Sequence, residues 1–262
     1  MSKNNRVKDL FQSAVDDGDL TQDAMNALTV VDIGAQIQAG LGVSVDDVEA
    51  SDVVLLTIMP DDSGSIASAQ NEQNVRDGHN LVLDALMASK QQDNVLAHTR
   101  YLNGEVLFPY VAISQAIRLD NLNYNPNKGT PLYDQAIVLL GTVLAKTKEF
   151  ADNGVPARTI TLIITDGDDV HSVRANPAMV KAVVDPMLRA ENHIIAAMGI
   201  DDGNTDFREI FREMGIRDEW ILTPANDQAE IRKAFQVFSQ SAVRASQSAV
   251  NFSQMAMGGF GN

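Results

Sequence analysis

The sequence predicts an α/β fold in which a mostly parallel sheet, with one antiparallel edge strand, carries helices on both faces. Three observations support this prediction. Two apolar runs, 53–59 and 159–165, have the length and β-branched content of buried strands. From residue 52 onward such runs alternate with helical patterns, an order typical of parallel sheets. The dipeptide Asn103-Gly104 is typical of tight hairpins and therefore predicts the antiparallel edge.

Size and composition suit one domain of about 200 residues with extensions. The chain has 262 residues, of which 45% are hydrophobic and 5% aromatic, so an aliphatic core is expected. The absence of cysteine excludes disulfides and zinc–thiolate sites and agrees with a reducing compartment. The sequence shows neither a signal-peptide pattern nor an apolar run of membrane-spanning length, so we expect a cytoplasmic protein. A net charge of −15 argues against nucleic acid and membrane surfaces as partners.

Residues 1–48 are predicted to form a helical N-terminal extension. Val7, Phe11 and Ala14 recur at helical spacing in a first helix, and a second helix is expected from Thr21 to the glycines at 40 and 42. Our main interpretation is a helical hairpin packed on the domain. The alternative is a docking arm for a partner.

The main domain is predicted over residues 49–238, as strands that alternate with helices. The expected strands are 53–59, 94–102, 105–108, 159–165, 193–200 and 220–223. The expected helices are 67–90, 132–150, 177–189, 206–214 and a long one from 227.

Residues 239–262 are predicted to form a C-terminal helix extension and a flexible tail. A seven-residue repeat places Ala242, Ala249 and Ala256 on one helical face. This pattern favours a helix that lies along the domain, and self-association through it is the alternative. The glycine-rich end, 258–262, is expected to fray, although its phenylalanine could form a short recognition peptide.

The loop directly after the run 53–59 is the first candidate for a functional site. Asp61, Ser63 and Ser65 alternate along it, so their oxygens can turn toward one point, and Gly64 allows close backbone approach. Oxygen ligands without a soft donor suit a hard cation such as Mg²⁺, with Mn²⁺ or Ca²⁺ as alternatives. The competing structural interpretation is a polar turn that caps the following helix.

Two later segments offer further oxygen ligands. Thr130 precedes Pro131 and a helical run, so we expect its hydroxyl at a loop–helix junction as the helix cap. Asp166 ends the run 159–165 and is followed by a glycine. Strand ends of this kind carry the ligand sites of open α/β sheets.

The order Asp61-x-Ser63-x-Ser65, then Thr130, then Asp166 resembles the metal-ion-dependent adhesion site (MIDAS) of the von Willebrand factor A (vWA) family. This resemblance implies a Rossmann-like vWA fold. It also implies that the two serines and the threonine contact the ion directly, while the aspartates act directly or through water. One coordination position then stays open for an acidic side chain of a protein partner. The near-minimal chain and its Ser-rich terminal helix are similar to stand-alone cytoplasmic bacterial or phage vWA proteins linked to tellurite resistance and stress response.

Other polar residues near these loops are expected to play lesser roles. Asp62, Asp168 and Asp169 should raise the local negative potential, and Asp134 should lie at the surface or behind the ligands. His171 is expected to face solvent, or else to adjust a ligand contact. The four histidines show no metal-ligand spacing.

The leading functional hypothesis is a metal-dependent protein-binding module, an intracellular adaptor or scaffold rather than an enzyme. An assembly protein that oligomerises through its terminal helices, as a possible homo-oligomer, is the alternative. A Mg²⁺-dependent phosphatase or hydrolase is a further one. The sequence offers neither a general base nor a phosphate-holding Lys or Arg at these loops, which weighs against the enzyme.

Overall fold

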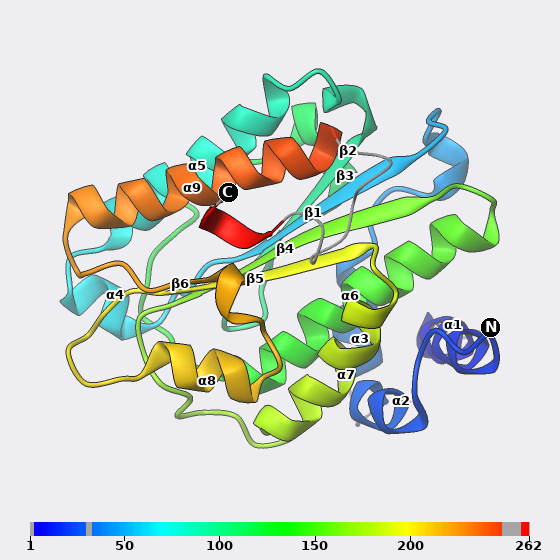
Figure 1. Cartoon of the computed structure of the whole chain (residues 1–262), viewed down its shortest axis with the longest axis horizontal. Helices are drawn as coiled ribbons and strands as arrows, with labels where there is room; N and C mark the ends of the chain where they lie inside the picture. The colour runs from blue at the N-terminus through cyan, green and yellow to red at the C-terminus, as the bar shows by residue number, and fades with distance from the viewer. Residues whose placement is uncertain (1–2, 30–32, 248–257, 262) are drawn as a thin grey trace.

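The computed structural model describes residues 3–29, 33–247 and 258–261 and contains a six-stranded sheet between two helical layers (Figure 1). The strand order is β3-β2-β1-β4-β5-β6. Only the β2–β3 pair is antiparallel, and it lies at one edge, as predicted. The strands are β1 (Val53–Met59), β2 (Val95–Arg100), β3 (Val106–Ala112), β4 (Ala157–Thr165), β5 (His193–Gly199) and β6 (Ile221–Leu222).

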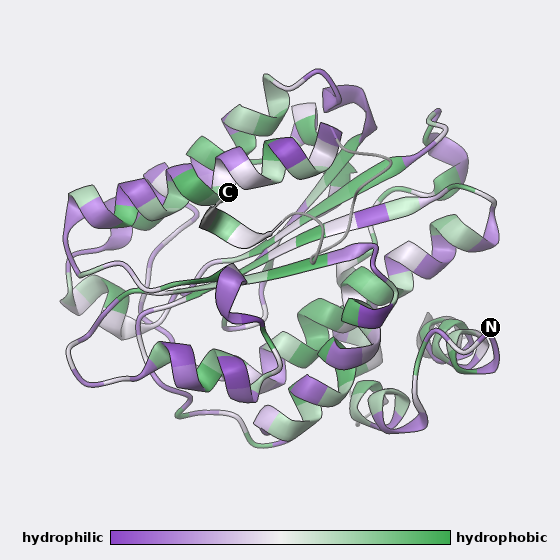
Figure 2. Cartoon of the chain, viewed as in Figure 1, coloured by the Kyte–Doolittle hydropathy of each residue, from purple (hydrophilic) through white to green (hydrophobic). Residues whose placement is uncertain are grey.

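Helices cover both faces of the sheet (Figure 1). On one face, α6 (Leu132–Asp152) and α7 (Pro177–Arg189) pack against β1, β4 and β5, and α1 (Lys3–Asp16), α2 (Gln22–Leu28) and α3 (Ile33–Gly40) pack outside them. On the other face, α5 (Glu72–Met87) packs along α9 (Gln228–Gln247). Figure 2 shows strongly hydrophobic central strands and helices of mixed hydropathy, as expected for a sheet buried on both faces.

The register of the two central strands brings their carboxyl ends together. β1 and β4 are parallel neighbours, and Met59 lies opposite Ile163. All seven residues of β1 are buried, because helices cover both of its faces. The loops that begin after β1 and after β4 therefore leave the same edge of the sheet side by side, at a position where α/β folds bind ligands.

Two predicted helices are each divided in the structure. The second N-terminal helix was expected to continue from Thr21 to Gly40, but α2 ends at Leu28 and α3 begins at Ile33. The expected helix 67–90 is divided into α4 (Gly64–Ser68) and α5, and Gln70 between them has a φ of 59°. A left-handed residue cannot continue a right-handed helix, so the chain turns there.

The β2–β3 hairpin loop is one residue longer than the predicted two-residue turn. Tyr101 N–H donates to the Glu105 carbonyl, so these residues close the hairpin around three loop residues. Gly104 supplies the left-handed position with a φ of 98°.

The C-terminal tip packs on the domain, so the prediction of a frayed end is wrong for its described residues. Within η5 (Gly259–Gly261), the ring of Phe260 lies 5.1 Å from that of Trp220 and 6.3 Å from that of Phe238. α9 continues without interruption past residue 238, and a domain boundary there stays a prediction. Most of the predicted seven-residue repeat falls within 248–257, outside the described residues.

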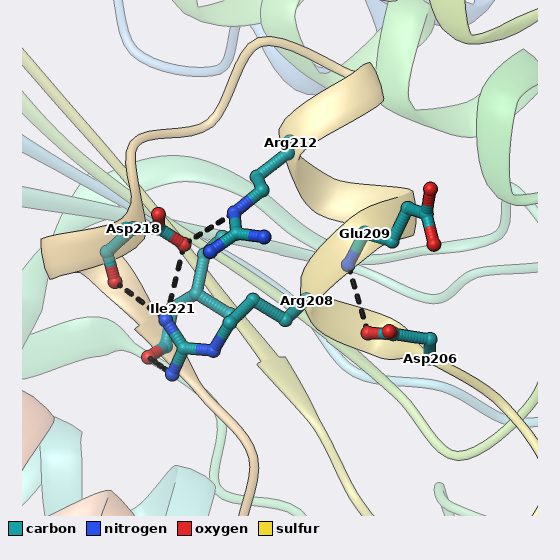
Figure 3. A network of polar contacts seen from close by, with 6 residues as sticks. All are labelled: Asp206, Arg208, Glu209, Arg212, Asp218 and Ile221. Carbon is teal, nitrogen blue, oxygen red and sulfur yellow. Dashed lines mark hydrogen bonds and ion pairs between the residues drawn. The ribbon is translucent and has the colours of Figure 1, made fainter.

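Near the other sheet edge, α8 (Phe207–Glu213) is joined to η4 (Asp218–Trp220) by a network of arginine and aspartate side chains (Figure 3). In the described part of the chain, no helix by itself has both the length and the apolar character to cross a bilayer. Segments 22–28 and 33–47, which are bent relative to each other, have the length and apolar composition of a membrane span only when they are taken together.

Candidate metal centre

Asp61 organises the loop after β1. One carboxylate oxygen, Oδ1, accepts a hydrogen bond from the Ser63 backbone N–H at 2.7 Å, which closes a tight turn. The other, Oδ2, accepts from the Thr165 hydroxyl at 2.7 Å and, more weakly, from the Asp166 N–H at 3.4 Å. One side chain thus ties the end of β1 to the end of β4.

A short chain of hydrogen bonds joins three of the predicted ligands. The hydroxyls of Ser63 and Ser65 lie 2.8 Å apart, and the Ser65 hydroxyl donates to Asp166 Oδ1 at 2.6 Å. Ser63 precedes α4 but its side chain makes no capping bond. The competing interpretation, a serine that only caps the following helix, therefore does not describe Ser63.

Thr130 lies between the two loops. Its carbonyl accepts from the N–H groups of Val170 and His171, and its own N–H donates to His171 Nδ1 at 2.9 Å. Two residues earlier, Lys128 forms a parallel bridge with Ser63, and its carbonyl accepts from Gly64 N–H. These bonds hold the Thr130 segment against both the loop after β1 and the loop after β4.

The predicted cap at Thr130 is wrong by one residue. The N-cap of α6 is Pro131, and α6 begins at Leu132. The Thr130 hydroxyl is therefore not the cap of this helix.

The site buries negative charge without a positive partner. Asp61 and Asp166 are 0% and 4% exposed, and in the described part of the chain neither forms an ion pair. Burial raises the pKa of Asp61, and burial together with the charge of Asp61 raises the pKa of Asp166 to about 6. Buried carboxylates normally require a cation or many donors, so this arrangement favours a positive ligand.

The set of donor atoms fits a hard divalent ion. Hydrogen bonds among the described residues join two carboxylates to the hydroxyls of Ser63, Ser65 and Thr165, which are all oxygen donors of the kind such an ion prefers. Among the described residues, no group of three or more His, Cys, Asp and Glu side chains is placed to hold a metal. Any ion here would therefore depend on the serine and threonine hydroxyls, as the MIDAS resemblance implies.

Asp62 lies next to the site but points to a different partner. Its carboxylate accepts from the backbone N–H of Asn103 at 3.0 Å and from the Asn103 side chain at 2.6 Å. Burial raises the pKa of Asp62 to about 7. This residue links the site to the β2–β3 hairpin, and its contribution to the negative potential stays a prediction.

Asp134 is buried and supports the loop after β4, so of its two expected positions the surface one is wrong. Its carboxylate accepts three backbone hydrogen bonds, from Val173 at 3.1 Å, Arg174 at 3.0 Å and Ala175 at 2.7 Å. The next bond in this network is between the Ser172 hydroxyl and Asp169 Oδ1, at 2.6 Å. In a sequence, an acidic residue in the first turn of a helix suggests an exposed side chain. Here that side chain instead accepts hydrogen bonds from the backbone N–H groups of another loop.

Sequence reasoning also missed Thr165 and the anchoring role of His171. Thr165 is the last residue of β4 and immediately precedes Asp166, so its place at a strand end was the available signal. His171 is exposed, as expected, but its ring accepts the Thr130 N–H. Gly129 allows this contact, because a Cβ there would lie 2.8 Å from the His171 ring.

No protein-family model matches the sequence, and no curated protein matches it. Among solved structures, the chain is similar to the pilus adhesin SpaC of Lactobacillus rhamnosus GG in its open conformation. The match has 12% identity and a TM-score of 0.53, and it covers 75% of this chain and 30% of the adhesin.

Two further structures are similar at lower scores. Proximal thread matrix protein 1 from the mussel byssus, with a zinc-occupied MIDAS motif, matches with 15% identity and a TM-score of 0.48 over 73% of this chain and 46% of its own. The manganese-loaded TRAP protein of Plasmodium vivax matches with 15% identity and a TM-score of 0.42 over 72% and 74%. The chain spans less than half the length of the adhesin and the byssus protein.

The six-stranded sheet with one antiparallel edge is the arrangement that the vWA resemblance implies, so the expectation about the fold is confirmed.

Proposed function

We propose that this chain is a metal-ion-dependent protein-binding module. A divalent cation, Mg²⁺ or Mn²⁺, would be held by oxygens of Asp61, Ser63, Ser65, Thr130 and Asp166. An acidic side chain of a partner protein would complete its coordination. The observation that supports this most directly is the pair of buried carboxylates, Asp61 and Asp166, joined to two serine hydroxyls without a positive partner in the described residues.

Electrostatics would make such binding depend on the metal. Without a cation, the carboxylates at this rim repel an approaching carboxylate. With a divalent ion that the three neutral hydroxyls contact directly and the aspartates hold through water, the ion would stay electrophilic enough to attract one. Binding of this kind requires no chemical reaction. We therefore propose that the chain acts as an intracellular adaptor protein and not as an enzyme.

The assembly hypothesis is supported less well. Within the described residues, α1 and α2 pack against α6, α2 also packs against α7, and α9 packs against α5, so these terminal helices already bury apolar faces on their own chain.

Calorimetric titration with Mg²⁺ and Mn²⁺ tests the proposal. We expect one site in the wild-type chain and a loss of at least about 100-fold in affinity in Asp61→Ala and Thr130→Ala, because each removes an oxygen ligand. Asp218→Ala, an aspartate far along the chain that is paired with arginines, serves as the control and should bind metal normally. A wild-type chain without measurable metal binding would refute the proposal. Capture of partners with and without EDTA, followed by mass spectrometry, then identifies the partner.

A further inference from the structure

The loop that follows Asp166 exposes large apolar side chains in an unusual way. Four large hydrophobic residues are strongly exposed in the described part of the chain, and two of them, Val170 at 72% and Val173 at 84%, lie on this loop between β4 and α7. Single exposed apolar residues need no explanation, but two that are three positions apart beside a candidate site do.

The exposure of these valines does not result from a poorly anchored loop. The buried Asp134 accepts the N–H groups of residues 173, 174 and 175, and Asp134 N–H in turn donates to the Ser172 hydroxyl at 2.9 Å. The Thr130 carbonyl accepts the N–H of Val170. The backbone N–H groups of residues 170, 171 and 173–175 are therefore satisfied, while the side chains of Val170 and Val173 face solvent. The loop thus holds two exposed valines on an anchored backbone, beside exposed polar side chains such as that of Arg174.

The backbone of this loop lies beside the candidate metal centre. Val170 is one hydrogen bond away from the backbone of Thr130, a proposed ligand, and four residues along the chain from Asp166, another. A partner segment that reaches the ion from the side of this loop would therefore pass close to these valines. The exposed Asp168 between them and the site would repel a second acidic residue at this place but not an apolar one.

We propose that Val170 and Val173 form a recognition surface for an aliphatic or aromatic side chain that lies within about three residues of the partner's metal-binding Asp or Glu. Three residues of extended chain span about 10 Å, at a rise of about 3.3 Å per residue. This inference rests on the proposed metal-dependent function. The metal bond supplies attraction to any accessible carboxylate, and the apolar contact selects among them.

Selection from a random-peptide display library on the immobilised full chain tests this inference, with Mn²⁺ in one arm and EDTA in the other. We expect the Mn²⁺ arm to enrich peptides with an acidic residue near Val, Leu, Ile, Phe or Tyr. A selected peptide should bind the double variant Val170→Ser/Val173→Ser about tenfold more weakly, because apolar burial is lost. The affinity of that variant for Mn²⁺ alone should be unchanged. Leu122→Ser, at a position 87% exposed on another loop, is the matched control and should bind the peptide as the wild type does.

The outcomes separate the two claims. Enriched peptides that carry an acid without an apolar neighbour, or equal binding to the double variant, would overturn this inference and leave the proposed function standing. If Mn²⁺ binds but the Mn²⁺ arm enriches no acidic peptides, the protein-binding role and this inference both fail. If the wild-type chain does not bind Mn²⁺, the metal site itself is wrong.

Discussion

Two groups of aspartates in this molecule have opposite electrostatic surroundings. Asp218 lies at the surface between Arg208 and Arg212, at 3.1 and 2.7 Å, and the Arg212 hydrogen bond lowers its pKa (Figure 3). Asp61 and Asp166 are buried, form no ion pair within the described residues, and have raised pKa values. An aspartate side chain thus forms surface ion pairs at residue 218, whereas the aspartates at 61 and 166 are buried without an ion pair in the described residues. Only the second arrangement gains from an added cation.

The largest expected effect is the stabilisation of the folded chain by added metal, which should distinguish the two groups of aspartates. Mg²⁺ or Mn²⁺ at about 100 times its dissociation constant should stabilise the wild-type chain by about 2.7 kcal/mol, because only the folded state assembles the site. Asp218→Asn should show the same gain, and Asp61→Ala should show none. Thermal unfolding with and without metal measures this. An equal gain in Asp61→Ala would place the metal elsewhere.

Asp134 offers a third case, a buried carboxylate satisfied by backbone donors. Asp134→Ala should lower the free energy of unfolding by about 2–3 kcal/mol, because charge-assisted bonds to three N–H groups are lost. Denaturant unfolding of the metal-free chain measures this loss. Asp134→Asn, which keeps one acceptor oxygen, should lose less. If both variants are as stable as the wild type, the loop after β4 does not depend on this side chain.

Removing the charge of an aspartate should have opposite effects on the stability of the chain at residues 166 and 218. Asp166→Asn keeps the Oδ1 acceptor for Ser65 and removes a buried charge, so above pH 7 it should stabilise the metal-free chain by about 1–2 kcal/mol. The same change should weaken metal binding. Asp218→Asn should instead lower the melting temperature slightly, since it breaks surface ion pairs. A destabilised Asp166→Asn would show that its charge is already compensated.

The smallest expected effect is on pH dependence. The pKa of Asp166 is about 6 in the folded chain, against an ordinary value of 3.8, so the folded state binds more protons between these values. The stability of the metal-free chain should therefore fall as pH rises through this window. Metal requires the ionised carboxylate, so its dissociation constant should rise about tenfold from pH 7 to pH 5. Titrations at these two pH values measure the change, and a constant affinity would contradict it.

Much of the fold was predictable from local pattern. The run 53–59 is apolar at all but one position, and the run 159–165 consists of isoleucine, leucine and threonine. Such runs are typical of strands buried on both faces, and both are strands in the structure. Helix 177–189 was predicted with its observed ends, and in the structure Asn176 caps it and Pro177 begins it. Breaks inside helices were not predictable, since Gln70 adopts its left-handed conformation without a glycine to indicate it.

The candidate site was predictable in part. Hydrogen bonds join Asp61, Ser63, Ser65 and Asp166, as their positions at neighbouring strand ends suggested. Their role as metal ligands stays a prediction. Asp134 and His171 were missed as anchors because their partners are backbone groups of a loop about 40 residues away in sequence, and a sequence pattern does not indicate such pairs.

The packing of the C-terminal tip has a practical consequence. Trp220 is the single tryptophan of the chain, and its 1% exposed ring has the Phe260 ring at its edge. Gly259 allows this fit, since a Cβ there would lie 2.5 Å from the Glu219 carbonyl oxygen. The intrinsic fluorescence of Trp220 should therefore report, without an added label, whether residues 258–261 are packed against the domain.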